Sequence, residues 1–372
     1  MKGATNLRIL FISAKGDGLG VATHLSSEGH NVHFVMNKES SVGKGVVEEQ
    51  SVVVNDLTSF NPDITPHVIT RLLANHTPDM VMFDSPQYGR TADYVRTCGM
   101  RVLGASQWAS TIDTNELYEQ TIIESMGWNV KPNPKHTDAY VTCWFNGQRY
   151  MSFYTSVVYH RFMSGGVGPD LGITGVISNF SSPTRRMNEE ILDPLSKVLK
   201  KVNHRGCFHI HLKVDDKGFS VDSITAALDS PLALVLFENS QVHTSDILVR
   251  LFDENSHEIR TLDPWAMAVL ISVPPYPYAS DNRKIVLGGV EPANLKHLWL
   301  KDVQTGVTGW TTTGLHGSVG YVTARGTDTN ECRRRVYRTI KNLRVPDLQY
   351  RNDIGKDTFF LTDALRKSGW LN

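Results

Sequence analysis

The chain has 372 residues, of which 40% are hydrophobic and 20% are charged, a composition typical of a soluble globular protein with more than one domain. Its 38 basic residues balance its 38 acidic residues, so no net field attracts it to nucleic acid or to an anionic membrane, although a local basic patch is compatible with this balance. Four widely spaced cysteines without a CxxC pair argue against a zinc site and against a disulfide framework.

No apolar run approaches the ~20 residues of a membrane span. The chain passes from Met1 into a predicted core strand without the apolar region of a signal peptide. We therefore expect a cytoplasmic protein that makes no contact with a membrane.

The first third of the chain alternates short apolar runs with helix-compatible stretches. The apolar runs are Leu7–Ile12, Asn31–Met36, Asp79–Asp84 and Arg101–Gly104. This α/β alternation predicts a parallel, doubly wound, Rossmann-like N-terminal domain over residues 1–112.

A glycine-rich turn follows the first predicted strand. Gly16, Gly18 and Gly20 stand just before a helix-like stretch. Backbone N–H groups at the start of a helix can bind a phosphate, so these glycines are candidate ligand-binding residues. The alternative is a purely structural tight turn, because the spacing departs from the strict dinucleotide fingerprint.

Beyond about residue 112 the pattern changes from α/β to α+β. Asn146-Gly147 lies between alternating apolar runs and predicts a β-hairpin, and residues 215–218 join a second antiparallel pair. Between the hairpins we expect a glycine-rich loop over 164–175 and one helix over 186–202. These features predict a mixed domain over residues 113–262 and a small β-rich domain with one helix over residues 263–372.

Four stretches, in order along the chain, carry family-like motifs, and the C-terminal one is the most specific. Gly320–Gly326, Glu331–Ile340 and Leu348–Gly355 contain a "VTA-G" strand, a helix and a "YR-DIG" tail. This pattern resembles the phosphoribosylamine–glycine ligase (glycinamide ribonucleotide synthetase) family of ATP-grasp enzymes. Gly99–Glu116 resembles the segment where the family's N-terminal domain meets its ATP-grasp core, with Asp-Thr-Asn where the family has Gly-Ser-Lys.

Thr155–Arg161 and Gly168–Gly175 are similar to the family's "TSQDHKR" and "GPNTGGMG" loop, which in relatives holds phosphoribosylamine and the reacting carboxylate. The resemblance implies a ligand site for a phosphate or carboxylate, since such a site needs donors and approachable backbone. The alternative is an inherited loop kept for folding. The candidate ligand-binding residues are His160, Arg161, Gly168, Pro169, Gly172 and Gly175.

Residues 206–229 resemble the family's hairpin ending in "EFN-RFGDPE". Asp222 and Asp229 fall on its acidic positions and are the candidate metal ligands. Ile224 and Ala226 stand where the family has Asn and Arg, and an Ile cannot coordinate Mg²⁺, which requires oxygen ligands.

Relatives grip the triphosphate and the adenine with a small lid domain, at a point where this chain has only Trp128–Thr137 before the first hairpin. Phosphoryl transfer depends on positioning and on charge stabilisation, which the lid and the metal supply. The resemblance therefore predicts a reduced ATP-grasp core that lacks the lid, with ATP and Mg²⁺ use lost or altered.

The predicted function is that of a diverged glycinamide ribonucleotide synthetase-like protein that binds a phosphoribosyl or nucleotide-type ligand. One alternative is a functional amine–carboxylate ligase or an ATP-independent amino-acid transferase acting on a nucleotide or nucleobase. The other is a non-catalytic binding or scaffold protein. The sequence assigns no catalytic residue, cofactor, pathway or oligomeric state.

Two further patterns carry alternatives. His209 and His211 alternate on one predicted strand and face the same side, either as a metal pair or as part of a half-exposed strand face. Arg333–Arg335 with Arg338 predict a basic helix face, which is either a solvated surface or a contact for nucleic acid or a phosphorylated ligand.

Overall fold

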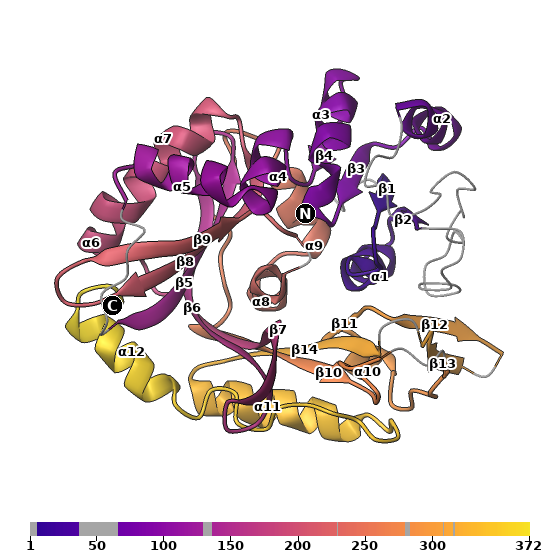
Figure 1. The fold of residues 1–372 in the computed structure, drawn as a ribbon. Coiled ribbons are helices and arrows are strands. Elements are labelled where there is room, and N and C mark those ends of the chain that lie inside the picture. Colours follow the sequence, from indigo (N-terminus) through magenta and orange to yellow (C-terminus); the bar gives the residue numbers. More distant parts are fainter. Residues whose placement is uncertain are drawn as a thin grey trace.

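The residues that the structure describes form two large β-sheets, one parallel and one antiparallel, and a separate two-stranded sheet (Figure 1). The computed structural model describes residues 6–36, 66–128, 136–228, 230–279, 283–307, 309–314 and 317–372. Within these ranges, no helix combines the length and the apolar content that a membrane crossing requires.

The N-terminal part contains a parallel four-stranded sheet in the order β2-β1-β3-β4, as the α/β alternation predicts. Its strands are β1 (Arg8–Ile12), β2 (Asn31–Val35), β3 (Met80–Phe83) and β4 (Val102–Leu103). Its helices are α1 (Leu19–Ser27), α2 (Pro66–His76), a 3₁₀ turn η1 (Pro86–Tyr88) and α3 (Gly89–Thr97). Ile9 and Phe11 belong to one apolar core, and Leu10 and Ile12 to another. The strand is apolar at consecutive positions because both of its faces are covered.

The second sheet is antiparallel, with eight strands in the order β11-β14-β10-β7-β6-β5-β8-β9. The five strands from the middle of the chain are β5 (Thr137–Asn146), β6 (Tyr150–Met163), β7 (Val167–Asn179), β8 (Arg205–Val214) and β9 (Phe219–Thr225). Its other strands are β10 (Trp265–Ser272), β11 (Leu298–Leu300) and β14 (Ser318–Gly326). A separate pair is formed by β12 (Val303–Gly306) and β13 (Gly309–Thr312).

The prediction of a glycine-rich loop over 164–175 is wrong for most of its length. Residues 164–166 form the turn of a long hairpin, and β7 begins at Val167. Gly168 and Gly172 have φ values of 85° and 80°, and the pairing register shifts beside them, so they occupy irregular positions in a strand.

The helices of the middle and C-terminal parts cover the large sheet. They are α4 (Gln107–Thr114), α5 (Glu116–Ser125), α6 (Arg185–Met187), a π-helical turn η2 (Asn188–Leu192), α7 (Asp193–Lys201), α8 (Pro231–Asn239), α9 (Thr244–Arg250), α10 (Pro292–Leu295), α11 (Thr329–Asn342) and α12 (Thr358–Lys367). The predicted helix over 186–202 forms as one continuous helical run over 185–201, with the π-helical turn η2 within it. Pro194 lacks an N–H for the carbonyl of Glu190, which instead accepts a bond from the Trp128 indole at 2.9 Å.

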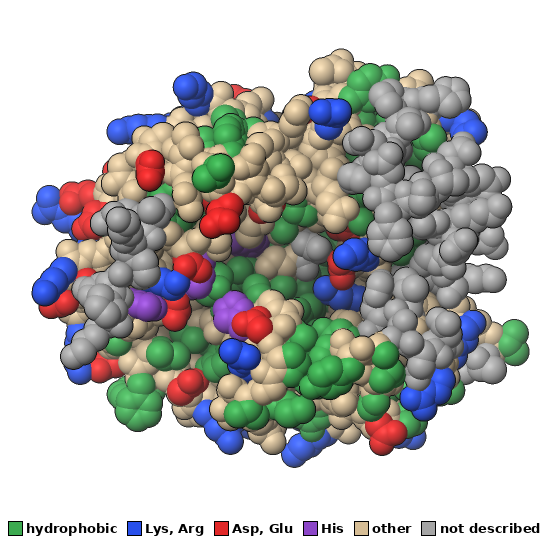
Figure 2. All heavy atoms as spheres, viewed as in Figure 1, with side chains coloured by type: hydrophobic (Ala, Val, Ile, Leu, Met, Phe, Trp, Pro, Cys, Tyr) green, Lys and Arg blue, Asp and Glu red, His purple; other side chains and the backbone are tan. Residues whose placement is uncertain are grey.

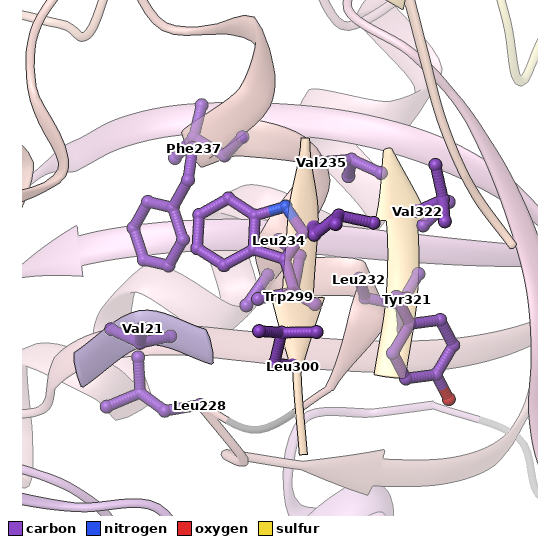
Figure 3. Packing of buried hydrophobic residues seen from close by; sticks show 14 of the residues in the cluster. Val21, Leu228, Leu232, Leu234, Val235, Phe237, Trp299, Leu300, Tyr321 and Val322 are labelled. Atoms are coloured by element: carbon purple, nitrogen blue, oxygen red, sulfur yellow. The ribbon is translucent and has the colours of Figure 1, made fainter. Parts of the chain in front are cut away.

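The centre of the molecule is the buried helix α8. Its sequence is apolar on every side, and a helix of this kind requires neighbours all round. Figure 3 shows Leu232 and Val235 of α8 beside Trp299 of β11 and Val322 of β14, with Val21 of α1 close by. The same apolar cluster includes residues of both sheets.

The large sheet crosses the predicted boundary between residues 262 and 263. β7 pairs with β10 from Gly175↔Val269 to Asn179↔Trp265, so the middle and C-terminal parts share one continuous sheet.

Candidate functional site

One face of β5 and β8 changes along its length from apolar core to polar surface. The register pairs Trp144 with Cys207, Thr142 with His209, Tyr140 with His211, and Asp138 with Lys213. Alternate residues of a strand share a face, so these side chains lie in line. We name Asp138, Tyr140, His160, His211, Lys213 and Asp222 the polar row. Figure 2 shows histidine, acidic and basic side chains gathered around a hollow in this region.

His211 lies between two carboxylates. Its Nε2 is 2.9 Å from Asp138 Oδ1, and its Nδ1 is 3.0 Å from Asp222 Oδ2. Ionised carboxylates only accept, so both contacts are satisfied together when the ring carries both protons. The hydrogen bond from His211 lowers the pKa of Asp138. Lys213 pairs with the other oxygen of Asp222, so both oxygens of that carboxylate contact a basic side chain.

Tyr140 connects His160 to His211 within the polar row. Its ring stacks on His211 with centroids 4.2 Å apart, and its hydroxyl is 3.0 Å from His160 Nε2. His160 Nδ1 is 2.6 Å from the carbonyl oxygen of Gly172, which can only accept. In the neutral ring Nδ1 is therefore the donor, and Nε2 accepts from Tyr140. Burial, then Asp138, Asp222 and Asp170, raise the pKa of Tyr140, which favours the protonated hydroxyl.

His209 lies one step deeper on the same strand and is buried. Its Nε2 donates to the Ala227 carbonyl at 3.1 Å, and Thr142 Oγ1 lies 2.9 Å from its Nδ1. Burial lowers the pKa of His209 to about 4. His209 and His211 do face the same side, but both nitrogens of each ring are already engaged. Among the described residues, no group of three His, Cys, Asp or Glu side chains is placed to hold a metal ion.

Only one of the two predicted metal ligands lies among the described residues. Asp222 lies on β9 with its salt bridges to His211 and Lys213, and Asp229 lies outside the described residues. Ile224 and Ala226 are buried in the apolar core on the far side of β8 and β9. The carboxylate of Glu119 accepts the Ile224 backbone N–H at 2.7 Å.

The C-terminal tail fixes the hairpin of β6 and β7. Arg351 and Asp353 form a bidentate pair at 2.9 and 2.8 Å, and Asp353 also accepts the Gly165 N–H at 2.7 Å. Arg351 donates to the Arg161 carbonyl at 3.0 Å. At Gly175 a Cβ would lie 2.5 Å from Ile354, so glycine permits the close approach of the tail.

The other predicted hairpin residues are more exposed. The Arg161 guanidinium donates to the Gly168 carbonyl at 3.0 Å, which ties the two strands together near the turn. Gly172 donates its N–H to Asp170 at 3.1 Å, and Pro169 lies between these positions on β7. Of the predicted hairpin residues, His160 belongs to the polar row, and Gly172 is linked to the row through its hydrogen bond to His160.

The glycine turn after β1 is occupied by a carboxylate of the protein itself. Asp84 accepts the Gly18 N–H at 2.9 Å and bonds to the Ser13 hydroxyl, while Gly16 donates to Ser13 at 2.8 Å. Burial raises the pKa of Asp84 to about 6. A Cβ at Gly20 would lie 2.7 Å from the Trp299 backbone. These contacts favour the structural alternative for the turn.

Sequence reasoning missed Tyr140, His211, Asp138 and Lys213 as members of one cluster. The signal was the alternation of polar residues, "D-x-Y-x-T" on β5 and "H-x-H-x-K" on β8. Only the antiparallel register brings the two patterns opposite each other.

Comparisons with solved structures place the fold, while no family model matches the sequence. Phosphoribosylamine–glycine ligase from Thermotoga maritima aligns with a TM-score of 0.70 at 14% identity, covering 93% of this chain and 100% of that one. L-amino acid ligase from Bacillus licheniformis aligns with a TM-score of 0.59 at 14% identity, covering 92% and 99%. The biotin carboxylase subunit of pyruvate carboxylase aligns with a TM-score of 0.64 at 9% identity, covering 97% and 98%. With its parallel sheet and large antiparallel sheet, the chain therefore has an ATP-grasp-like fold, shared with ligases and carboxylases.

Proposed function

We propose that this protein is a diverged glycinamide ribonucleotide synthetase-like protein that binds a phosphoribosyl or nucleotide-type ligand over the polar row and has lost or altered the use of ATP. The observation that carries the proposal is the environment of Asp222. One of its oxygens contacts His211 and the other contacts Lys213. A carboxylate that bridges Mg²⁺ to a nucleotide needs oxygens free for the metal, and here two basic groups compete for them.

The same basic groups suit an anionic ligand. His211 and Lys213 both contact the carboxylate of Asp222, so an anionic group that displaces this carboxylate gains two basic partners. Tyr140 adds a flat ring between His160 and His211. Phosphate and carboxylate groups bind best to such charged donors. The short segment Trp128–Thr137, in place of a lid, supports altered ATP use. The names of two structural neighbours, a phosphoribosylamine–glycine ligase and an L-amino acid ligase, support an acceptor site for a phosphoribosyl or amino-acid compound.

Isothermal titration calorimetry of the full chain tests the proposal with three probes: glycinamide ribonucleotide, AMP, and ATP with Mg²⁺. We expect heat from at least one of the first two in magnesium-free buffer, and none from ATP with Mg²⁺. The variant Lys213→Gln should weaken phosphate-ligand binding about tenfold, the value of one charge-assisted hydrogen bond. Lys217→Gln, in the exposed turn before β9, is the matched control and should bind as wild type.

Tight magnesium-dependent ATP binding would overturn the loss of ATP use. Folded protein that binds none of the three probes would overturn the ligand site and favour the scaffold alternative.

The second candidate is an ATP-independent amino-acid transferase, and the Tyr140–His160 hydrogen bond favours it. Because Nε2 of His160 accepts from the Tyr140 hydroxyl, that hydroxyl can pass a proton from an attacking amine to His160. In that step the amine nitrogen bonds to the acyl carbon of an aminoacyl thioester and the thiolate leaves. The amine proton passes to the Tyr140 hydroxyl as that hydroxyl gives its own proton to His160.

Mass spectrometry of the protein with glycyl thioester and glycinamide ribonucleotide or AMP as acceptor, without ATP, tests this candidate. We expect an amide product that His160→Asn abolishes. Ligand binding without any product would leave the non-catalytic binder as the function.

A further inference from the structure

A basic face on α11 has no role in the site described above. Arg334, Arg338 and Lys341 follow one another at spacings of four and three residues, so they lie on one side of the helix. All three are exposed, and Tyr337 lies between them, half-buried. We name Arg334, Tyr337, Arg338 and Lys341 the α11 basic face. A shallow groove of about 640 Å³ follows it.

The opposite side of α11 anchors the helix. Cys332, Val336 and Ile340 are buried in the main apolar cluster. The helix packs against β10 and β14, and α8 packs against the same two strands from the other face of the sheet (Figure 1). The basic face is therefore presented outward on a rigid support, away from α8.

The charges of this face are largely unneutralised. Glu331 pairs with Arg335 at 2.7 Å and accepts two bonds from Thr327, while its distance to Arg334 is 3.5 Å. An exposed ion pair at the Arg334–Glu331 distance neutralises little of the arginine's charge. Arg338 and Lys341 have no ion pair within the part of the chain that the structure describes. The whole chain has a net charge of zero, so this local excess of positive charge stands out from its surroundings.

We propose that the α11 basic face binds the phosphodiester backbone of a nucleic acid. Arg334 and Lys341 are seven positions apart on the helix, a rise of about 10 Å. Phosphates of one strand follow one another at about 3.4 Å along the axis of a duplex, so the three cations span roughly three phosphates. Guanidinium groups bind phosphate with two parallel hydrogen bonds, and the face contains two of them.

An anionic membrane fits this face less well than nucleic acid does. A helix that lies on a membrane inserts its apolar side into the lipid. The apolar side of α11 is already buried against β10 and β14, so the outward side presents cations, asparagines and the half-buried Tyr337 rather than an apolar surface.

Fluorescence anisotropy of labelled 20-nucleotide probes tests the proposal with the full chain at 50 to 200 mM salt. The probes are duplex DNA, single-stranded DNA and single-stranded RNA. We expect at least one to bind, and the triple variant Arg334→Glu, Arg338→Glu, Lys341→Glu to lose at least about a hundredfold in affinity at the lowest salt. The slope of log K against log salt should become shallower by about 2 to 3, as expected for the loss of three phosphate contacts.

The matched control reverses three exposed lysines on α7, as Lys197→Glu, Lys200→Glu, Lys201→Glu. It makes the same change in net charge on another helix and should keep most of the affinity. The milder Arg334→Gln, Arg338→Gln, Lys341→Gln variant serves if charge reversal unfolds the protein, as judged by circular dichroism.

Three results would overturn the proposal: no binding by wild type at 50 mM salt, equal loss in the α7 control, or an unchanged salt slope in the α11 variants. Binding to phosphatidylserine vesicles without binding to any nucleic acid would assign the face to a membrane instead.

Discussion

His209 and His211 are two residues apart on β8, yet their surroundings give them different chemistry. His209 is buried against the Ala227 carbonyl and Thr142, whereas His211 faces two carboxylates at the polar end of the strand. His209 is structural and His211 is a candidate binding residue because the two side chains lie at different depths along the same face of the sheet.

The buried His209 makes stability depend on pH. Its pKa is about 4 in the folded protein and about 6.5 in an unfolded chain. Its contribution is therefore fully present above pH 6.5 and is lost as the pH falls towards 4, by up to on the order of 3 kcal/mol. We expect His209→Gln to flatten the fall in urea midpoint between pH 7 and pH 4.5, because Gln cannot be protonated there.

His257→Gln, at an exposed position, is the control and should follow the wild-type pH profile. Asp84 acts with the opposite sign: its pKa is raised to about 6, so its contribution grows as the pH falls from 6 towards 3.8. Comparing the urea midpoints of each variant and of wild type at every pH separates the effect of His209 from that of Asp84. Parallel profiles for His209→Gln and wild type would contradict the assignment.

Gly18 is required by packing. An added Cβ would lie 2.3 Å from Cε1 of Phe11, whose ring is 1% exposed and has no room to move. We expect Gly18→Ala to lower the free energy of unfolding by about 1 to 3 kcal/mol, the usual cost of overpacking. Gly218→Ala, where nothing lies within 4 Å of the added carbon, should unfold at the wild-type denaturant concentration.

At the scale of elements, the C-terminal tail holds the hairpin of β6 and β7 in place. The side chains of Arg351 and Asp353 are 5% and 17% exposed, and removing one partner leaves the other charge poorly solvated. We expect Asp353→Asn to lower the free energy of unfolding by about 2 to 3 kcal/mol, which is less than the loss for a fully buried pair. Hydrogen exchange should show faster amide exchange over residues 161–168.

Asp363→Asn breaks an exposed pair with Lys367 on α12 and is the control, with an expected change within about 0.5 kcal/mol. Unchanged exchange over 161–168 in Asp353→Asn would show that the hairpin does not depend on the tail.

Local patterns predicted those elements whose hydrogen bonds are short-range or whose apolar period is clear. The hairpin at Asn146-Gly147, strand β14 and helix α11 all form where expected. The glycine content of segment 164–175 favours a loop, whereas pairing with β6 makes most of it a strand. Tertiary pairing decided the structure there.

The site was harder to predict than the fold. His160 was found through its motif, but its partner Tyr140 and the neighbouring His211 come from strands far apart in sequence. Their meeting depends on the register between β5, β6 and β8, which a one-residue slip would destroy and which no single strand's pattern contains.

At the scale of the whole molecule, the continuous eight-stranded sheet predicts cooperative unfolding. β7 and β10 are adjacent strands from the two sides of the predicted boundary at 262/263. We expect hydrogen exchange in increasing denaturant to show one common midpoint for peptides of β8 and of β14. Two separate midpoints would support independent domains at that boundary.

The burial of α8 has a consequence for dissecting the protein. Since Leu232, Val235 and Phe237 pack among residues of both sheets, a fragment that stops before residue 231 would leave a long apolar trench open to water. Such a fragment would aggregate rather than report on the N-terminal half alone, and trimming from the C-terminal end would be equally disruptive because Ile340, Leu365 and Trp370 are also buried in the core.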